Sequence, residues 1–72
     1  MILFDYTELQ KRIDEKFETR KAFAAAVGVS ESTLRAWLQN KRYMATNAMH
    51  IMAEVLEIPG TEVEKYFFRR IN

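Results

Sequence analysis

The side chains best suited to binding chemistry in this 72-residue chain are basic groups gathered in its middle. Residues 19–53 contain one acidic residue, Glu31, and the basic residues Arg20, Lys21, Arg35, Lys41 and Arg42. The segments on either side are each net acidic, and the whole chain has a net charge of +1. Such a basic stripe suits contacts with nucleic-acid phosphates. A chance cluster on a solvated face explains the same charges, and charge alone does not separate the two interpretations.

No arrangement of residues indicates catalysis or a resident cofactor. The chain has no cysteine and one histidine, His50, so a Cys/His or multi-histidine metal site cannot form. No Ser/His/Asp set, buried carboxylate pair or glycine-rich phosphate loop is recognisable. We therefore expect no enzyme, no cofactor, no metal and no small-molecule substrate.

The lack of cysteine also bears on the compartment, because chains without disulfides are typical of reducing environments. The apolar run Met1–Phe4 ends at Asp5, which makes it too short for a signal-peptide core or a membrane span. We therefore expect an intracellular protein that does not bind a membrane.

The elements that must position the basic side chains are predicted to be helices. The length indicates a single domain, 1–72, and the 49% of hydrophobic residues supply its core. Apolar residues recur at spacings of three and four, and glycine and proline occur only at Gly28, Pro59 and Gly60. The pattern predicts a compact, all-α five-helix bundle with helices over about 6–17, 20–27, 31–39, 47–57 and 62–68.

Polar residues that precede the predicted helices supply capping groups for their first turns. Thr19 and Ser30 are expected to cap the second and third helices through their hydroxyl oxygens. Thr46 is expected to cap the fourth, and either Thr7 or Asp5 opens the first.

Other residues predict where the helices end and where the fifth begins. Gly28 suits a left-handed helix end, and Asn40 tolerates the positive φ that would stop the third helix. Pro59 is expected to end the fourth helix, because it lacks an N–H group. Thr61 with Glu64 predicts a capping box for the fifth.

A short turn connects the second and third predicted helices. Only residues 28–30 separate them, so a steep crossing needs a positive-φ residue in the turn and a small residue at the contact. Gly28 and Ala24 supply these. Leu34 and Leu38 are expected to anchor the third helix in the core. Its outward side then carries Glu31, Ser32, Arg35, Ala36 and Gln39.

The segment Phe23–Leu34, FAAAVGVSESTL, resembles the helix-turn-helix of the lambda-type repressor and Cro family. The following RAWLQNKR, residues 35–42, is similar to the recognition helix and basic exit turn of that family. The opening Phe4-Asp5-Tyr6 and the closing stretch 58–68 resemble, more narrowly, small lactic-phage regulators of the lysis–lysogeny switch. Within that group the resemblance is to the modulator-of-repression, or antirepressor, type.

The resemblance implies a recognition helix over 31–39 that lies in the major groove of DNA. Carried over by position, Glu31, Ser32 and Ala36 fall where the family reads bases, and Arg35 and Gln39 share their side of the helix. The residues implied to contact phosphates or a partner are Arg20, Lys21, Asn40, Lys41, Arg42, Tyr43 and Asn47.

Three departures from the family pattern shape the functional expectation. Glu31 places a negative charge at a reading position, and Ala36 offers only a methyl group. Arg20 stands where the family usually has glutamine, which keeps a phosphate contact but not an amide bridge. We expect an antirepressor that binds the phage repressor protein, with or without operator DNA, in the cytoplasm of a bacterial host. The alternatives are a Cro-like homodimer that binds operator DNA directly, and a purely structural helical bundle.

Apolar groups at the two ends of the chain leave a choice open. Residues 2–4 and 66–68, with Ile71, either pack together to close the core or form an exposed patch that pairs with a copy or a partner. We expect packing, because so short a chain needs the buried area. Met44, Met49 and Met52 are expected to fill the core, and Trp37 to be half-buried.

Overall fold

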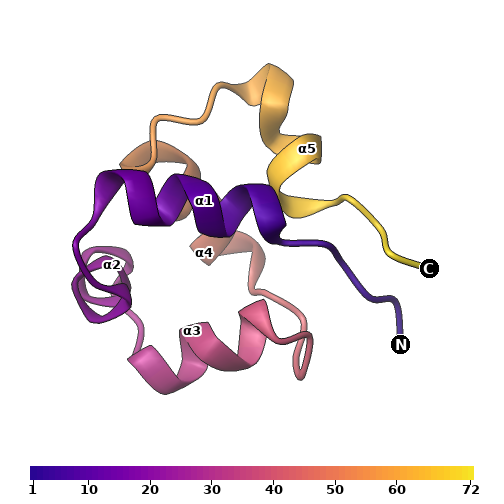
Figure 1. The fold of residues 1–72 in the computed structure, drawn as a ribbon, viewed down its shortest axis with the longest axis horizontal. Helices are drawn as coiled ribbons and strands as arrows, with labels where there is room; N and C mark the ends of the chain where they lie inside the picture. Colours follow the sequence, from indigo (N-terminus) through magenta and orange to yellow (C-terminus); the bar gives the residue numbers. More distant parts are fainter.

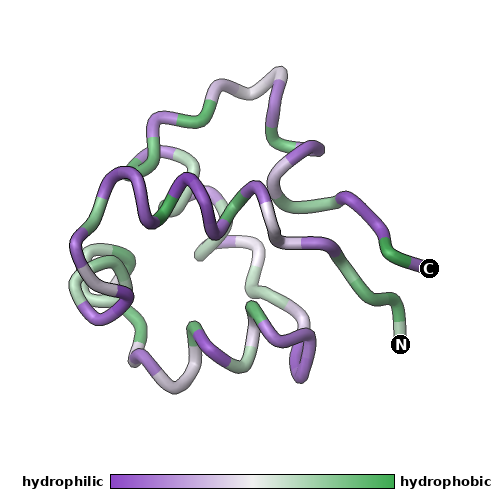
Figure 2. Tube along the Cα trace, in the orientation of Figure 1, coloured by the Kyte–Doolittle hydropathy of each residue, from purple (hydrophilic) through white to green (hydrophobic).

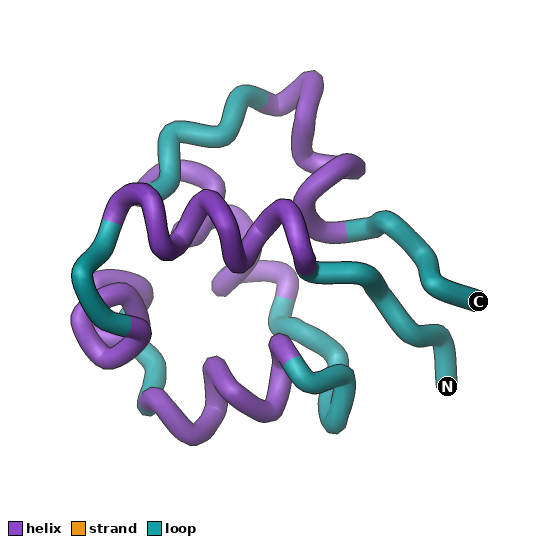
Figure 3. Tube along the Cα trace, viewed as in Figure 1, coloured by secondary structure: helices purple, strands orange, loops and turns teal.

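The computed structural model describes residues 1–72 and is all-helical (Figure 3). Its elements are α1 (Thr7–Lys16), α2 (Arg20–Val27), α3 (Glu31–Leu38), α4 (Thr46–Val55), the 3-10 turn η1 (Gly60–Glu62) and α5 (Val63–Phe67). The predicted all-α architecture of five helices is confirmed. Each observed helix begins and ends within two residues of its predicted limits.

The helices pack around one centre (Figure 1). α1 packs on α2 and α5, and α2 packs on α3 and α4. α2 is viewed nearly end-on in Figure 1 while α3 lies in the plane of the picture, so these consecutive helices cross steeply. The radius of gyration is 11.2 Å, which agrees with the value of about 11 Å expected for a compact chain of this length.

Fourteen buried side chains form a single core, and none of them is charged. In Figure 2 hydrophobic and hydrophilic segments alternate along α1, as expected for a helix with one face on this core. Met44 and Met52 are buried and Met49 is partly buried, which confirms that the methionines fill the core. Trp37 is only 7% exposed, so it lies deeper than the half-buried position we predicted.

The caps of the α2–α3 junction follow the prediction. Thr19 Oγ1 accepts a hydrogen bond from the N–H of Ala22 at 3.0 Å, and Ser30 Oγ accepts one from Thr33 at 3.0 Å. Gly28 ends α2 with φ of 90°. At α1 neither predicted capping box forms: Tyr6 holds the N-cap position without a side-chain bond, and Asp5 Oδ1 accepts from the N–H of Thr7 at 2.9 Å.

Two further predicted helix caps are wrong. Thr46 is the first residue of α4, and the N-cap position is held by Ala45, which makes no side-chain capping bond. The capping box of Thr61 with Glu64 is absent, because residues 60–62 form the 3-10 turn η1 ahead of α5. In both places the hydroxyl sits inside the element, so it cannot accept from the orphan N–H groups of the first turn.

The end of α4 was also predicted too far along the chain. The helix stops at Val55, and Glu57 takes a positive φ of 56°. The N–H of Ile58 then donates to the carbonyl of Ala53 at 2.8 Å, which closes the helix end before Pro59 is reached. Leu56 and Ile58 on either side of the turn are both buried, so packing of these two side chains fixes the ending.

The two ends of the chain lie side by side (Figure 1). The N–H of Asp5 donates to the carbonyl of Arg69 at 2.6 Å, and that of Ile71 donates to Leu3 at 2.9 Å. The expected packing of the terminal groups is therefore right for Phe4, which is partly buried, and for the buried Phe67. It is wrong for the exposed members, which are Ile2, Leu3, Phe68 and Ile71.

Candidate nucleic-acid or partner interface

The residues predicted to contact a target from the third helix share one side of α3. Ser30 caps the helix, and the burial of Leu34 and Trp37 fixes which side faces the core. The opposite side is consequently turned outward. Four of the five predicted contact residues are exposed and Ala36 is partly buried; the exposed ones are Glu31, Ser32, Arg35 and Gln39.

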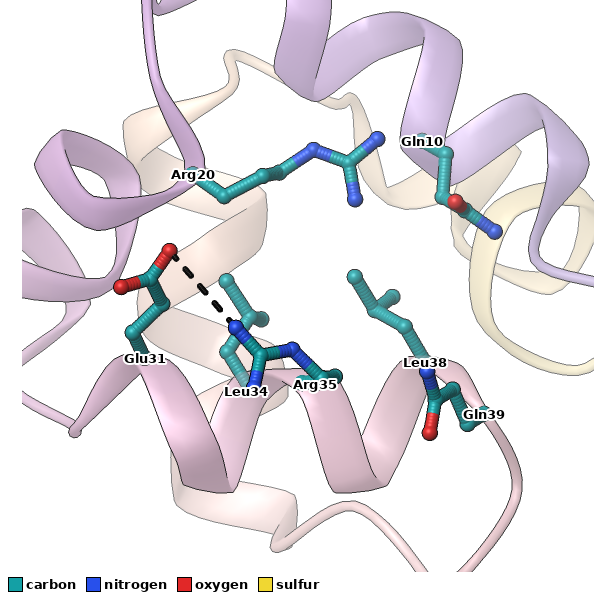
Figure 4. Close-up of a pocket in the computed structure, with 7 residues that line it drawn as sticks. All are labelled: Gln10, Arg20, Glu31, Leu34, Arg35, Leu38 and Gln39. Atoms are coloured by element: carbon teal, nitrogen blue, oxygen red, sulfur yellow. Dashed lines mark ion pairs between the residues drawn. The ribbon is translucent and has the colours of Figure 1, made fainter.

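A cleft of about 220 Å³ opens between α3, α1 and the first residue of α2 (Figure 4). Leu34 and Leu38 provide its apolar lining. The polar lining residues are Gln10, Arg20, Glu31, Arg35 and Gln39. Sequence reasoning missed Gln10, which lies on α1. No local signal marks this residue, because only the tertiary packing places it opposite α3.

Arg20 is held at the cleft by a carboxylate of α1. Its Nε and Nη2 atoms donate to the two oxygens of Asp14 at 2.9 and 3.1 Å. The hydrogen bond and the positive charge of Arg20 lower the pKa of Asp14 below its ordinary value. The guanidinium predicted to contact phosphate therefore already has an anionic partner in a bidentate arrangement.

Arg35 also faces a carboxylate. Its Nη2 atom lies 4.0 Å from Glu31 Oε2, one helical turn earlier on α3 (Figure 4). Both side chains are about half exposed, so water screens this pair more than a buried one. Together with the Arg20–Asp14 pair, it leaves neither guanidinium group at the cleft without a matching negative charge.

The remaining predicted cations surround α3 and make no ion pair within the chain. Lys21 on α2, and Lys41 and Arg42 in the turn after α3, are all exposed. Asn47 is exposed in the first turn of α4. These four side chains are accessible to a phosphate backbone or to an acidic protein surface.

Asn40 and Tyr43 serve a contact that the sequence did not predict. Asn40 has the expected positive φ, 60°. Its Oδ1 accepts from the N–H of Phe4 and its Nδ2 donates to the Phe4 carbonyl, both at 2.9 Å. The Tyr43 hydroxyl accepts from the N–H of Ile2 at 3.0 Å. The two side chains thus hold the N-terminal segment, and their assignment as phosphate or partner contacts stays a prediction.

Comparison with known proteins places a family model over nearly the whole chain. The model is described as "Protein of unknown function (DUF739)" and matches residues 2–70. No curated protein matches the chain. None of the helices has the length and apolar character needed to cross a membrane.

Proposed function

We propose that this chain, which belongs to the DUF739 family, is a regulator of a phage lysis–lysogeny switch in the bacterial cytoplasm. It acts as an antirepressor: the outward side of α3 and the adjoining cleft bind the phage repressor protein, with or without operator DNA. Neither a cofactor nor a catalytic step is part of this proposal.

The observation that carries the proposal is the internal charge matching around α3. A helix that reads DNA approaches a strongly negative groove, where unmatched cations give most of the affinity. Here Arg20 is paired with Asp14, and Arg35 lies near Glu31. Glu31 is also in the first turn of α3, the end that would meet the base edges. This surface is better suited to bind a protein than to bind the phosphates of DNA.

A repressor supplies the complementary chemistry. Its DNA-contacting surface must be basic, because it neutralises phosphates. Glu31 at the cleft, which is about half exposed and lies 4.0 Å from Arg35, offers an anion to such a surface. The cleft itself, lined by Leu34 and Leu38, has room for an anchoring side chain of the partner. Binding there would cover the operator-contacting surface and relieve repression.

Direct operator binding by a pair of copies is a second candidate, and one observation favours it. Lys21, Lys41 and Arg42 flank α3 and have no ion-pair partner in the chain. The three-residue junction between α2 and α3 also has the order and spacing of a helix-turn-helix. In this case the affinity for DNA would fall steeply as the salt concentration rises, because binding releases counterions from the DNA.

The discriminating experiment follows a fluorescent operator–promoter duplex by anisotropy, with and without the adjacent repressor, and compares the wild type with Glu31→Gln. The antirepressor proposal predicts that the wild type displaces or joins the repressor and has little affinity for the duplex alone. Glu31→Gln should weaken association with the repressor by roughly tenfold, because it removes an anion from a basic interface.

The matched control is Glu54→Gln, which removes an exposed carboxylate from α4 rather than α3; it should leave association unchanged. Operator affinity well above that for random duplex, increased by Glu31→Gln and independent of the repressor, would select the second candidate. Failure to associate with either the repressor or the duplex at micromolar concentrations would refute both and support the purely structural bundle.

A further inference from the structure

Exposed apolar side chains concentrate at one place on the molecule. Of the seven large hydrophobic residues that are exposed, only Ile51 lies elsewhere. The other six form what we call the terminal surface: Met1, Ile2, Leu3, Tyr43, Phe68 and Ile71. A concentration of this kind on a small protein indicates an interaction site rather than scattered surface residues.

Hydrogen bonds and ring contacts tie these residues together. The N–H of Ile2 donates a hydrogen bond to the Tyr43 hydroxyl, and the N–H of Ile71 donates one to the Leu3 carbonyl. The ring of Phe4 lies between the two halves, 6.4 Å from the ring of Tyr43 and 6.2 Å from that of Phe68. Phe4 therefore joins Tyr43 and Phe68 on one face of the paired ends, whereas Leu3 and Ile71, the next opposed pair, project from the other face.

The two ends pair as a short antiparallel ladder. Phe4 and Arg70 lie opposite each other, and the hydrogen bonds are made by their neighbours, Asp5 with Arg69 and Ile71 with Leu3. In such a pair the N–H and C=O groups of the two opposed residues point away from each other, toward the outer edges. Phe4 and Arg70 thus mark the two edges of the ladder.

The two edges differ. The Phe4 edge is closed, because the amide of Asn40 bonds both its N–H and its carbonyl. At the other edge, neither the backbone N–H nor the backbone carbonyl of Arg70 has a hydrogen-bond partner in the chain. An open edge beside exposed apolar side chains is a template for another extended segment.

We infer that the terminal surface is an interface between two copies of this chain, in which the open Arg70 edges pair antiparallel to each other. The edge is self-complementary, since in an antiparallel pair the free N–H and carbonyl of Arg70 in one copy can meet the carbonyl and N–H of Asn72 in the other. Leu3 and Ile71, which share one face of the ladder, would then be covered by the same side chains of the second copy.

Charge selects the register of this pairing. An alignment centred on Arg70 would place two guanidinium groups directly opposite each other, which is destabilising. An alignment centred on Ile71 places this side chain opposite its counterpart, and Arg70 opposite Asn72 of the second copy, with no like charges in contact. The Asn72 carbonyl accepts from Arg70 Nε of its own chain at 2.9 Å, and its second lone pair is available to the Arg70 N–H of the other copy. Ile71 is 63% exposed in the single chain, so the second register covers an apolar residue that folding leaves in water.

Sedimentation of the full chain between about 1 μM and about 1 mM tests the inference, since small interfaces give weak association. The wild type should shift from the mass of one chain toward twice that value. Arg70→Pro should remain a single chain, because it removes the free N–H of the open edge without breaking an intrachain backbone bond. Arg70→Ala is the matched control; it keeps that N–H and should still dimerise.

A second pair of variants tests the apolar part, and thermal unfolding verifies that each variant folds. Ile71→Asp should abolish dimerisation, whereas Ile51→Asp, which alters the exposed hydrophobic residue outside the terminal surface, should not. A wild type that stays a single chain at every concentration would overturn the inference. So would a dimer that survives both Arg70→Pro and Ile71→Asp, because that dimer must use another surface.

Discussion

The α2–α3 unit and the terminal surface are both turned toward solvent, but they are built by opposite means. The α2–α3 unit is held to the core by Phe23, Leu34 and Trp37, each at most 7% exposed. Its outer groups, such as Arg35 and Glu31, match one another's charge. The terminal surface has exposed apolar groups and is held by hydrogen bonds at its closed edge. On α3, therefore, different side chains stabilise the fold and form the outer surface, whereas at the chain ends the same residues do both.

The largest effect should come from comparing an aromatic residue of each region. Trp37→Ala removes a buried side chain beneath α3 and should cost about 3–5 kcal/mol of unfolding free energy. Phe68→Ala removes a side chain that is 44% exposed and should cost about 1 kcal/mol, mainly through its contact with Phe4. Urea unfolding followed by circular dichroism measures both. Equal losses of unfolding free energy would show that the exposed ring of Phe68 stabilises the fold as much as the buried ring of Trp37, which would contradict this contrast.

The junction of α2 with α3 should respond to backbone geometry alone. A Cβ atom at Gly28 or Gly60 would meet nothing within 4 Å, but only Gly28 has a positive φ, 90°. Gly28→Ala should therefore cost about 1–2 kcal/mol. Gly60→Ala serves as the control and should be neutral or slightly stabilising, because it restricts the unfolded chain. The same urea titration reports both values, and a harmless Gly28→Ala would refute the strained-turn explanation.

The closed edge of the terminal surface can be opened with one substitution. Asn40→Gly keeps a residue that accepts positive φ but removes both hydrogen bonds to Phe4, which should cost about 1–2 kcal/mol. Tyr43→Phe removes only the bond to Ile2 and should cost less. Hydrogen exchange of the Phe4 amide should accelerate in Asn40→Gly but not in Tyr43→Phe. An unchanged Phe4 amide would show that Asn40 does not hold this segment.

The smallest effect concerns the charge pair beside the cleft. Arg20 lowers the pKa of Asp14 in the folded state, so the ionised pair stabilises the fold above the unfolded pKa of Asp14. That contribution is lost as the pH falls through the lower, folded pKa. Asp14→Asn should cost no more than about 1 kcal/mol at about pH 7, and this difference should vanish in strong acid. Urea midpoints of both proteins across pH test this; a difference that persists below both pKa values would exclude the ion pair as its cause.

Much of the fold was predictable from local signals. The hydrophobic periodicity located five helices, and Thr19, Ser30 and Gly28 make the caps and the turn that their chemistry predicts. The outward side of α3 followed from the burial expected of Leu34. These features depend on residues within one or two helical turns of one another, so local sequence patterns predict them.

The wrong cap and the contacts that were not predicted arise where the surrounding chain decides against, or adds to, a local preference. Thr61 has a suitable cap sequence, yet the chain between α4 and α5 forms a 3-10 turn. Asn40 and Tyr43 look like free polar groups beside a basic turn, but the N-terminal segment lies within their reach and bonds to them. Gln10 reaches the cleft only because α1 lies opposite α3.

The sequence by itself determined the helices, the three-residue junction and the set of side chains on the outer side of α3, because capping, periodicity and glycine geometry act over a few residues. Only the tertiary structure decided that Arg20 is matched by Asp14, that Asn40 closes one edge of the paired ends, and that the edge at Arg70 stays open. Hydrogen bonds and charge pairs between distant segments depend on distances that chain order does not specify, so they are fixed only when the core brings those segments together.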